Sequence, residues 1–208
     1  MHERTVDQIL GESWESYAQE EIASAGEHYP GRDRVVELFG EPDPFEEVVA
    51  PFGVRWPGLA AAPAGPWADA EQVAARVLAD LAEYDADAGA GAWGSYLLDR
   101  AYRSADLPLL AEERGLEGAG CRPYGMDEMC VVLRSWEERF GTRVVGLGDD
   151  RVIVSVAAPV RTTGEAEAIA AEHFAFSSDN ITQGHDETLR AYAANQIVGR
   201  QVWSFWWD

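Results

Sequence analysis

Residues 126–157 read MDEMCVVLRSWEERFGTRVVGLGDDRVIVSVA, and this stretch decides the fold. Its first part carries apolar side chains at helical spacing, and Gly141 follows as a C-terminal stop. Two runs rich in β-branched residues come next, over 142–147 and 151–157, separated only by Gly148, Asp149 and Asp150. The stretch therefore predicts a helix over 126–140 followed by a β-hairpin with a three-residue loop.

The residues on either side of this stretch extend the pattern. Upstream, we predict a strand over 93–100 and a short helix over 105–113 that is closed by Gly115. Downstream, Pro159 ends the second strand, and we predict helices over 165–176 and 186–197 and a terminal strand over 202–207. This order is typical of an α+β fold, a small and mainly antiparallel sheet with helices packed on one face.

The terminal strand is unusually rich in bulky side chains. Trp203, Phe205 and Trp207 share one face of it, and Trp206 lies on the other. Side chains this apolar are rarely left in water, so we expect the strand to be central or well covered.

The first half of the chain has a different character. We predict helices over 4–25, over 33–39 with Asp33 as N-cap and Gly40 as the stop, and over 69–84. Between the last two, six prolines within 42–66 indicate an irregular connection with short strands at 48–49 and 54–56. Residues 85–92 resemble a linker. We therefore expect an acidic, mostly helical N-terminal region over 1–92 and an α+β domain over 93–208.

Composition excludes several functions. The 208 residues include 37 acidic and 16 basic side chains, a net charge of −21, and all sixteen bases are arginine. Without lysine, the chain has no Schiff-base, phosphate-loop or kinase-type chemistry that needs an ε-amine. A protein this acidic repels phosphates, so we expect no nucleic-acid partner. Residues 1–120 hold 24 acids and 8 arginines, against 13 and 8 in the remainder, so any basic partner would meet the first half.

The two cysteines suggest neither a disulfide framework nor a zinc site. Cys121 and Cys130 lie nine residues apart, which lacks the paired spacing of zinc ligands. We expect reduced, buried thiols, no metal and no cofactor. The first residues show no secretory signal and no apolar run approaches a membrane span, so we predict a cytoplasmic protein without membrane contact.

Several blocks of the second half resemble a known family. They occur in order and are Leu133–Gly141, Val154–Pro159, Ala171–Phe176, Asp179–Gly184 and Trp203–Asp208. Over about residues 126–208, and more loosely from Tyr96, they resemble the bacterial family called domain of unknown function 4253. The resemblance implies a cytosolic protein of actinobacterial type and brings no activity. Members of the family commonly carry Cys-Pro-Asp where this chain has Ser177-Ser178-Asp179, so we expect no catalytic cysteine at this position.

Six polar residues near one helix end form the best candidate site: Glu172, His173, Asp179, Asn180, Gln183 and His185. Imidazoles and carboxylates could together form a metal site or an acid–base pair. Alternatively, Glu172 and His173 brace the turn, Asp179 and Asn180 bond to the loop backbone, and His185 lies on the surface. Because neither HxH nor HExxH spacing occurs, we favour the second interpretation and assign no catalytic residue.

The charged residues around Trp136 admit a similar choice. Arg134, Glu137, Glu138 and Arg139 could form an anion-binding edge, but opposite charges at helical spacing usually make a solvated face. We favour the solvated face, and we place Trp136 in the core.

These observations lead to one preferred function and two alternatives. We expect a non-enzymatic protein-binding module, of the kind found in immunity proteins or antitoxins, that acts as the acidic partner of a basic protein. The first alternative is a small enzyme or a metal- or ligand-binding protein with a site over the loop 177–185. The second is a homodimer that pairs through its tryptophan-rich terminal strand.

Overall fold

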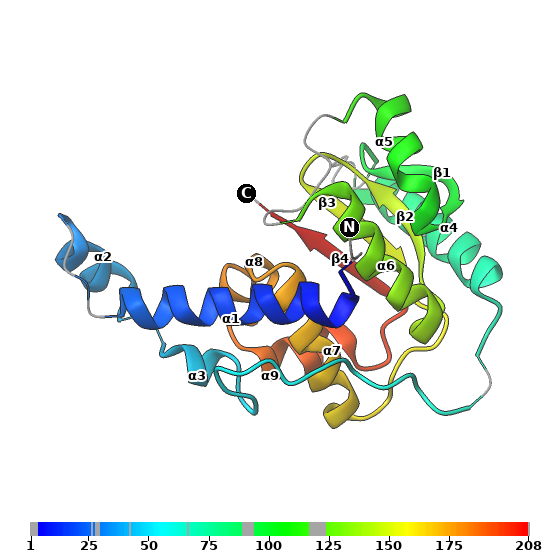
Figure 1. Ribbon diagram of the computed structural model, residues 1–208. Coiled ribbons are helices and arrows are strands. Elements are labelled where there is room, and N and C mark those ends of the chain that lie inside the picture. Colours follow the sequence, from blue (N-terminus) through cyan, green and yellow to red (C-terminus); the bar gives the residue numbers. More distant parts are fainter. Residues whose placement is uncertain are drawn as a thin grey trace.

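The computed structural model describes residues 4–25, 27, 30–41, 43–65, 67–88, 94–116 and 124–207, except for the side chains of residues 39, 87 and 88. In these residues, four antiparallel strands form one open sheet in the order β1-β2-β3-β4 (Figure 1). The strands are β1 (Leu97–Tyr102), β2 (Arg143–Leu147), β3 (Arg151–Ser155) and β4 (Val202–Trp206). The fold is therefore α+β, as predicted.

The helix and hairpin at the centre of the chain form as predicted. Helix α6 spans Met126–Phe140, and Gly141 ends it in the left-handed conformation, with φ of 63°. Strands β2 and β3 pair in antiparallel register, with Arg143 opposite Ser155 and Leu147 opposite Val152. A register irregularity between Val144 and Gly146 bends β2.

Helices cover both faces of the sheet, not one face as the sequence pattern suggested. On one face, α6 and α7 (Thr163–Phe176) bring Trp136 and Phe176 against Phe205 of β4, with ring centroids 5.0 and 5.1 Å from it. On the other face, α4 (Ala70–Ala88) packs Val73 and Val77 against the hairpin. Helix α4 of the first half thus covers one face of the sheet that the second half forms.

Helix α1 (Val6–Ser24) also packs on the second half. Thr5 begins it with a capping box to Gln8, and its buried side chains include Ile9, Leu10 and Trp14. The Trp14 ring lies 5.3 Å from that of Phe174 on α7. Residues from both halves therefore share one hydrophobic core. The predicted boundary at 92/93 falls outside the described residues and stays a prediction.

The connection between α1 and α4 differs from the prediction. Helix α2 (Arg32–Phe39) is preceded by Gly31 at φ of 93°, so Gly31 and not Asp33 is the N-cap. The predicted strands at 48–49 and 54–56 are absent from the described residues. Phe45–Val48 instead forms a helical turn, α3, that starts after Pro44, and residues 54–56 form no regular element. Helix α4 also continues through residues 85–88 of the predicted linker, whereas 89–92 lie outside the described residues.

The remaining elements show smaller shifts. Strand β1 begins at Leu97, and Trp93 lies outside the described residues. A 3-10 turn (Ser104–Asp106) leads into α5 (Leu107–Arg114), which Gly115 closes as predicted.

The predicted helix over 186–197 is wrong in length. Helix α9 starts only after Thr188, whose hydroxyl caps it, and spans Leu189–Tyr192. It continues as a π-helical turn, η2 (Ala193–Ile197). A short helix that the sequence did not predict, α8 (Asp179–Thr182), precedes it.

Strand β4 is well covered but lies at the edge of the sheet. Trp203, Phe205 and Trp207 are buried and Trp206 is half-buried. The far end of α1 and helix α2 extend away from the rest of the molecule (Figure 1). We call residues 20–41 the arm and the remaining described residues the body.

Candidate functional site

Glu172 lies at the centre of the body. Its side chain is fully buried, and its two carboxylate oxygens accept four hydrogen bonds. Two come from the guanidinium of Arg139, at 2.6 and 2.7 Å, one from the indole of Trp136, at 2.8 Å, and one from the backbone N–H of Ala60, at 2.7 Å. The carboxylate joins two helices to a first-half segment, so the predictions of a solvated Arg139 and of Glu172 as a turn brace are wrong.

His173 is enclosed by aromatic rings. Its centroid lies 4.6 Å from that of Trp203 and 4.7 Å from that of Phe205, and Nδ1 is 3.2 Å from the hydroxyl of Tyr192. Burial, with the nearby charge of Arg139, lowers the pKa of His173 well below its ordinary value. Burial also raises the pKa of Tyr192. Both groups are therefore neutral at physiological pH, and His173 has no exposed surface through which to exchange a proton with a substrate.

Asn180 forms hydrogen bonds with the outer edge of β4. Its amide nitrogen donates to the carbonyl of Ser204 at 2.7 Å, and its amide oxygen accepts from the N–H of Trp206 at 3.1 Å. Ser177 donates from its hydroxyl to the carbonyl of Trp206 at 2.6 Å. These side chains occupy positions that a fifth strand would otherwise take. The hydroxyl of Ser177 thus forms a structural hydrogen bond in this chain.

The six predicted residues do not converge. Gln183 donates to Asp179 at 3.1 Å on the exposed side of α8, and His185 is exposed. Glu172, His173 and Asn180 point inward, each to its own partners. Within the described residues, no three His, Cys, Asp or Glu side chains are grouped so that they could hold a metal ion.

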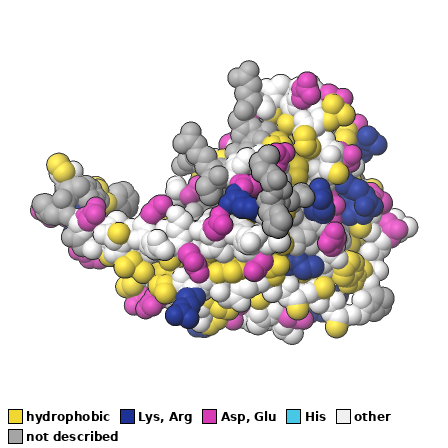
Figure 2. All heavy atoms as spheres, in the orientation of Figure 1, with side chains coloured by type: hydrophobic (Ala, Val, Ile, Leu, Met, Phe, Trp, Pro, Cys, Tyr) yellow, Lys and Arg dark blue, Asp and Glu magenta, His cyan; other side chains and the backbone are white. Residues whose placement is uncertain are grey.

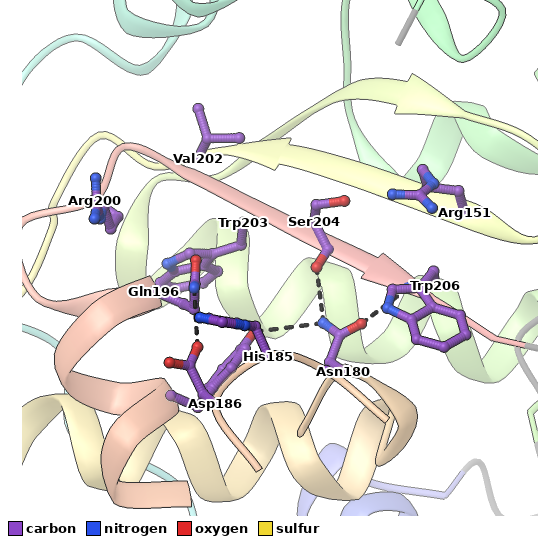
Figure 3. Close-up of a pocket in the computed structure, with 12 residues that line it drawn as sticks. Arg151, Asn180, His185, Asp186, Gln196, Arg200, Val202, Trp203, Ser204 and Trp206 are labelled. Atoms are coloured by element: carbon purple, nitrogen blue, oxygen red, sulfur yellow. Dashed lines mark hydrogen bonds between the residues drawn. The ribbon is translucent and has the colours of Figure 1, made fainter. Parts of the chain in front are cut away.

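A cavity of about 490 Å³ lies beside the edge of β4, and two predicted residues, Asn180 and His185, line it (Figure 3). Its other lining residues come mainly from β4 and from the segment 184–200. They are Arg151, Gly184, Asp186, Tyr192, Gln196, Arg200, Val202, Trp203, Ser204 and Trp206. Sequence reasoning missed this wall, because β4 and the π-helical turn meet only in the folded chain. The one available signal was the pair of arginines at the start of β3, Arg151, and two residues before β4, Arg200.

Cys130 lines a second cavity. This cavity lies between the start of α6 and residues 104–108 and also contacts Arg4 and Ile9 of the first half. Burial raises the pKa of Cys130 to about 11, so the thiol is protonated and weakly nucleophilic at neutral pH. Cys130 is a free, buried thiol as predicted, while Cys121 lies outside the described residues.

The arm presents a different kind of surface. Ile22, Val35 and Leu38 expose 54, 42 and 57% of their surface, and they are three of the seven large hydrophobic side chains exposed in the described residues. Residues 20–41 also contain six acidic side chains and two arginines. Both arginines pair within the arm, Arg32 with Glu41 and Arg34 with Glu37. Apolar and acidic side chains therefore occur together at the far end of the molecule (Figure 2).

The fold and these surfaces define an α+β protein with a cavity at the sheet edge and an acidic, partly apolar arm. The chain belongs to the family described as domain of unknown function (DUF4253), whose family model matches residues 101–208. A search of curated proteins and a search of solved structures found no match. Among the described helices, none has the length and apolar character needed to cross a bilayer.

Proposed function

We propose that this protein is a non-enzymatic protein-binding module whose arm docks a basic partner protein. The observation that carries the proposal is the exposure of Ile22, Val35 and Leu38 among acidic side chains. Exposed apolar groups within a polar surround are typical of docking surfaces. A partner with apolar side chains flanked by arginine or lysine would complement this surface.

The charge of the arm supports a basic partner in particular. Since Arg32 and Arg34 pair with Glu41 and Glu37, the remaining acids, which include Glu20 and Glu21, dominate the field of the arm. Such a field accelerates encounter with a cationic surface and weakens as salt rises. An immunity- or antitoxin-like role is the finer form of this proposal, and the acidity of the chain is its support.

The polar side chains of the body favour binding over catalysis. The carboxylate of Glu172 is occupied by Arg139, Trp136 and Ala60, and His173 is inaccessible. A cytoplasmic location belongs to the same proposal and is supported by the free thiol of Cys130. Homodimerisation through β4 is not part of it, because Asn180 and Ser177 already bond to the strand edge.

The experiment needs the full chain. Deletion of residues 1–92 would remove Trp14 and helix α4 from the core, so a fragment would report on folding and not on binding. We would purify the products of neighbouring genes and titrate them with the full chain by calorimetry at low and moderate salt. A double variant, Ile22→Ser with Leu38→Ser, tests the arm, and Leu109→Ser with Tyr84→Ser alters two exposed apolar residues elsewhere as a matched control.

We expect a basic protein to bind, with an affinity that falls as salt rises. The arm variant should weaken binding at least about tenfold, a loss of about 1.4 kcal/mol, while the control variant binds normally. Equal weakening by both variants would contradict the proposal. So would an affinity that changes neither with salt concentration nor in the arm variant.

A further inference from the structure

Two residues that line the cavity beside β4 have buried polar atoms without a hydrogen-bond partner among the described residues. Trp203 is 3% exposed and lines the cavity, yet its indole N–H has no acceptor among the described residues. The hydroxyl of Ser204, on the opposite face of β4, likewise has no partner in the described residues. A buried N–H without an acceptor is unfavourable and rare in folded proteins, so this N–H marks a place where an acceptor belongs.

The backbone of β4 adds donors to the same wall. Strand β4 pairs with β3 in antiparallel register, with Ser204 opposite Ile153. Because the carbonyl of Ser204 and the N–H of Trp206 point outward to Asn180, the N–H of Ser204 points to the same outer side. The free edge of the strand thus presents another donor next to the cavity.

Two of the residues that line the cavity have acceptors that are already hydrogen-bonded within the protein. Asp186 is the acidic residue among the lining side chains, and its two oxygens accept from Asn195 at 2.6 Å and from Gln196 at 2.9 Å. The amide oxygen of Asn180 accepts from Trp206. The carboxylate of Asp186 and the amide oxygen of Asn180 are therefore already engaged within the protein.

Two arginines give the cavity a positive charge within a strongly acidic protein. Arg200 and Trp203 lie at the beginning of β4, and Arg151 and Trp206 lie at its end (Figure 3). The Nε of Arg200 donates to the carbonyl of Asn195 at 2.9 Å, which orients its guanidinium at the rim. Arg151 stacks on Tyr96, 5.2 Å from the ring centroid.

We propose that this cavity binds a small organic anion. The carboxylate or phosphate group of this anion accepts a hydrogen bond from the indole N–H of Trp203, and the positive charge of Arg200 balances its negative charge. The volume of about 490 Å³ lies within the range of small-molecule sites. Trp206 and the exposed ring of His185 provide flat, partly apolar walls for the body of such a molecule. The net charge of −21 disfavours large polyanions such as nucleic acids, so the proposal is restricted to small anions, which the local charge of Arg200 can balance.

The indole N–H of Trp203 provides a direct readout. We would record two-dimensional ¹H–¹⁵N spectra of the full chain and assign the Trp203 indole signal by its loss in Trp203→Phe. The probes are sodium benzoate, phenyl phosphate and neutral benzamide, titrated at constant ionic strength. Benzoate and phenyl phosphate differ only in the anionic group, so their relative affinities distinguish the carboxylate and phosphate forms of the proposal.

At least one anion should shift the Trp203 signal saturably, and benzamide should not. Arg200→Gln should weaken that binding at least about fivefold, because a charge-assisted hydrogen bond is lost. Arg200 is exposed, so this variant should fold normally, and Arg161→Gln, at an exposed arginine outside the cavity lining, is the matched control.

Three results would overturn the proposal: no saturable shift from either anion up to about 50 mM, an equal shift from benzamide, or unchanged affinity in Arg200→Gln. The test is independent of the proposed function, because Leu38→Ser on the arm should leave anion binding unchanged.

Discussion

Two glutamate–arginine pairs with the same separation contrast the body with the arm. Glu172 and Arg139 in the body lie 2.6 Å apart, and so do Glu37 and Arg34 on the arm. The side chains of the body pair are 0 and 16% exposed, whereas those of the arm pair are 68 and 66% exposed. Water screens the arm pair and leaves both ions solvated when it breaks, while the body pair has no such alternative. The burial of each pair, and not the distance between its charges, therefore determines how much the pair contributes to folding stability.

The largest expected effect comes from breaking the body pair. Glu172→Gln keeps the shape of the side chain but leaves Arg139 charged and nearly buried, so we expect a loss of about 3–5 kcal/mol in the free energy of unfolding. Glu37→Gln on the arm should change it by less than about 0.5 kcal/mol. Urea unfolding followed by tryptophan fluorescence measures both. Similar losses in the two variants would show that the arm is packed as tightly as the body.

The sequence predicted the local features of the body and missed its long-range ones. Helix Met126–Phe140, its stop at Gly141 and the hairpin depend on neighbouring residues, so periodicity was sufficient. The charges around Trp136 suggested a solvated face, because local spacing cannot show that a carboxylate 33 residues away turns Arg139 inward. In the same way, nothing in the loop 177–185 indicates that Asn180 bonds to a strand 24 residues further along.

The second expected effect tests how the body protects its sheet edge. Asn180→Ala removes the bonds to Ser204 and Trp206 and leaves their backbone groups without a partner, so we expect a loss of about 1–3 kcal/mol. Asp179→Ala, on the adjacent and more exposed position, should cost less than about 0.5 kcal/mol. Sedimentation should also show self-association of Asn180→Ala, because the edge of β4 becomes available. A monomer of unchanged stability would mean that Asn180 does not protect this edge.

The third effect is the dependence of folding stability on pH, and it should differ between variants of His173 and His185. Because the folded pKa of His173 is well below its ordinary value, the unfolded chain binds a proton at this site that the folded chain does not. Stability should therefore fall as pH drops below about 6.5, by up to about 1.4 kcal/mol per pH unit from this group. His173→Gln should remove that part of the slope between about pH 6.5 and 5.5, and His185→Gln, at an exposed position, should not. Unfolding curves at several pH values measure the slope, and equal slopes in His173→Gln and the unchanged protein would refute buried, neutral His173.

The smallest expected effect on stability is the most informative about the arm. Leu38 exposes 57% of its surface, so Leu38→Ser removes little burial, and the lower helix propensity of serine should cost only about 0.5 kcal/mol. A loss above about 1.5 kcal/mol would instead place Leu38 in a packed interface, and the arm would then be part of the fold and not a docking surface. Thermal unfolding of Leu38→Ser beside the same substitution at exposed Leu109 distinguishes these outcomes. If Leu38→Ser has normal stability but no longer binds the partner, Leu38 serves partner recognition and is not needed for folding.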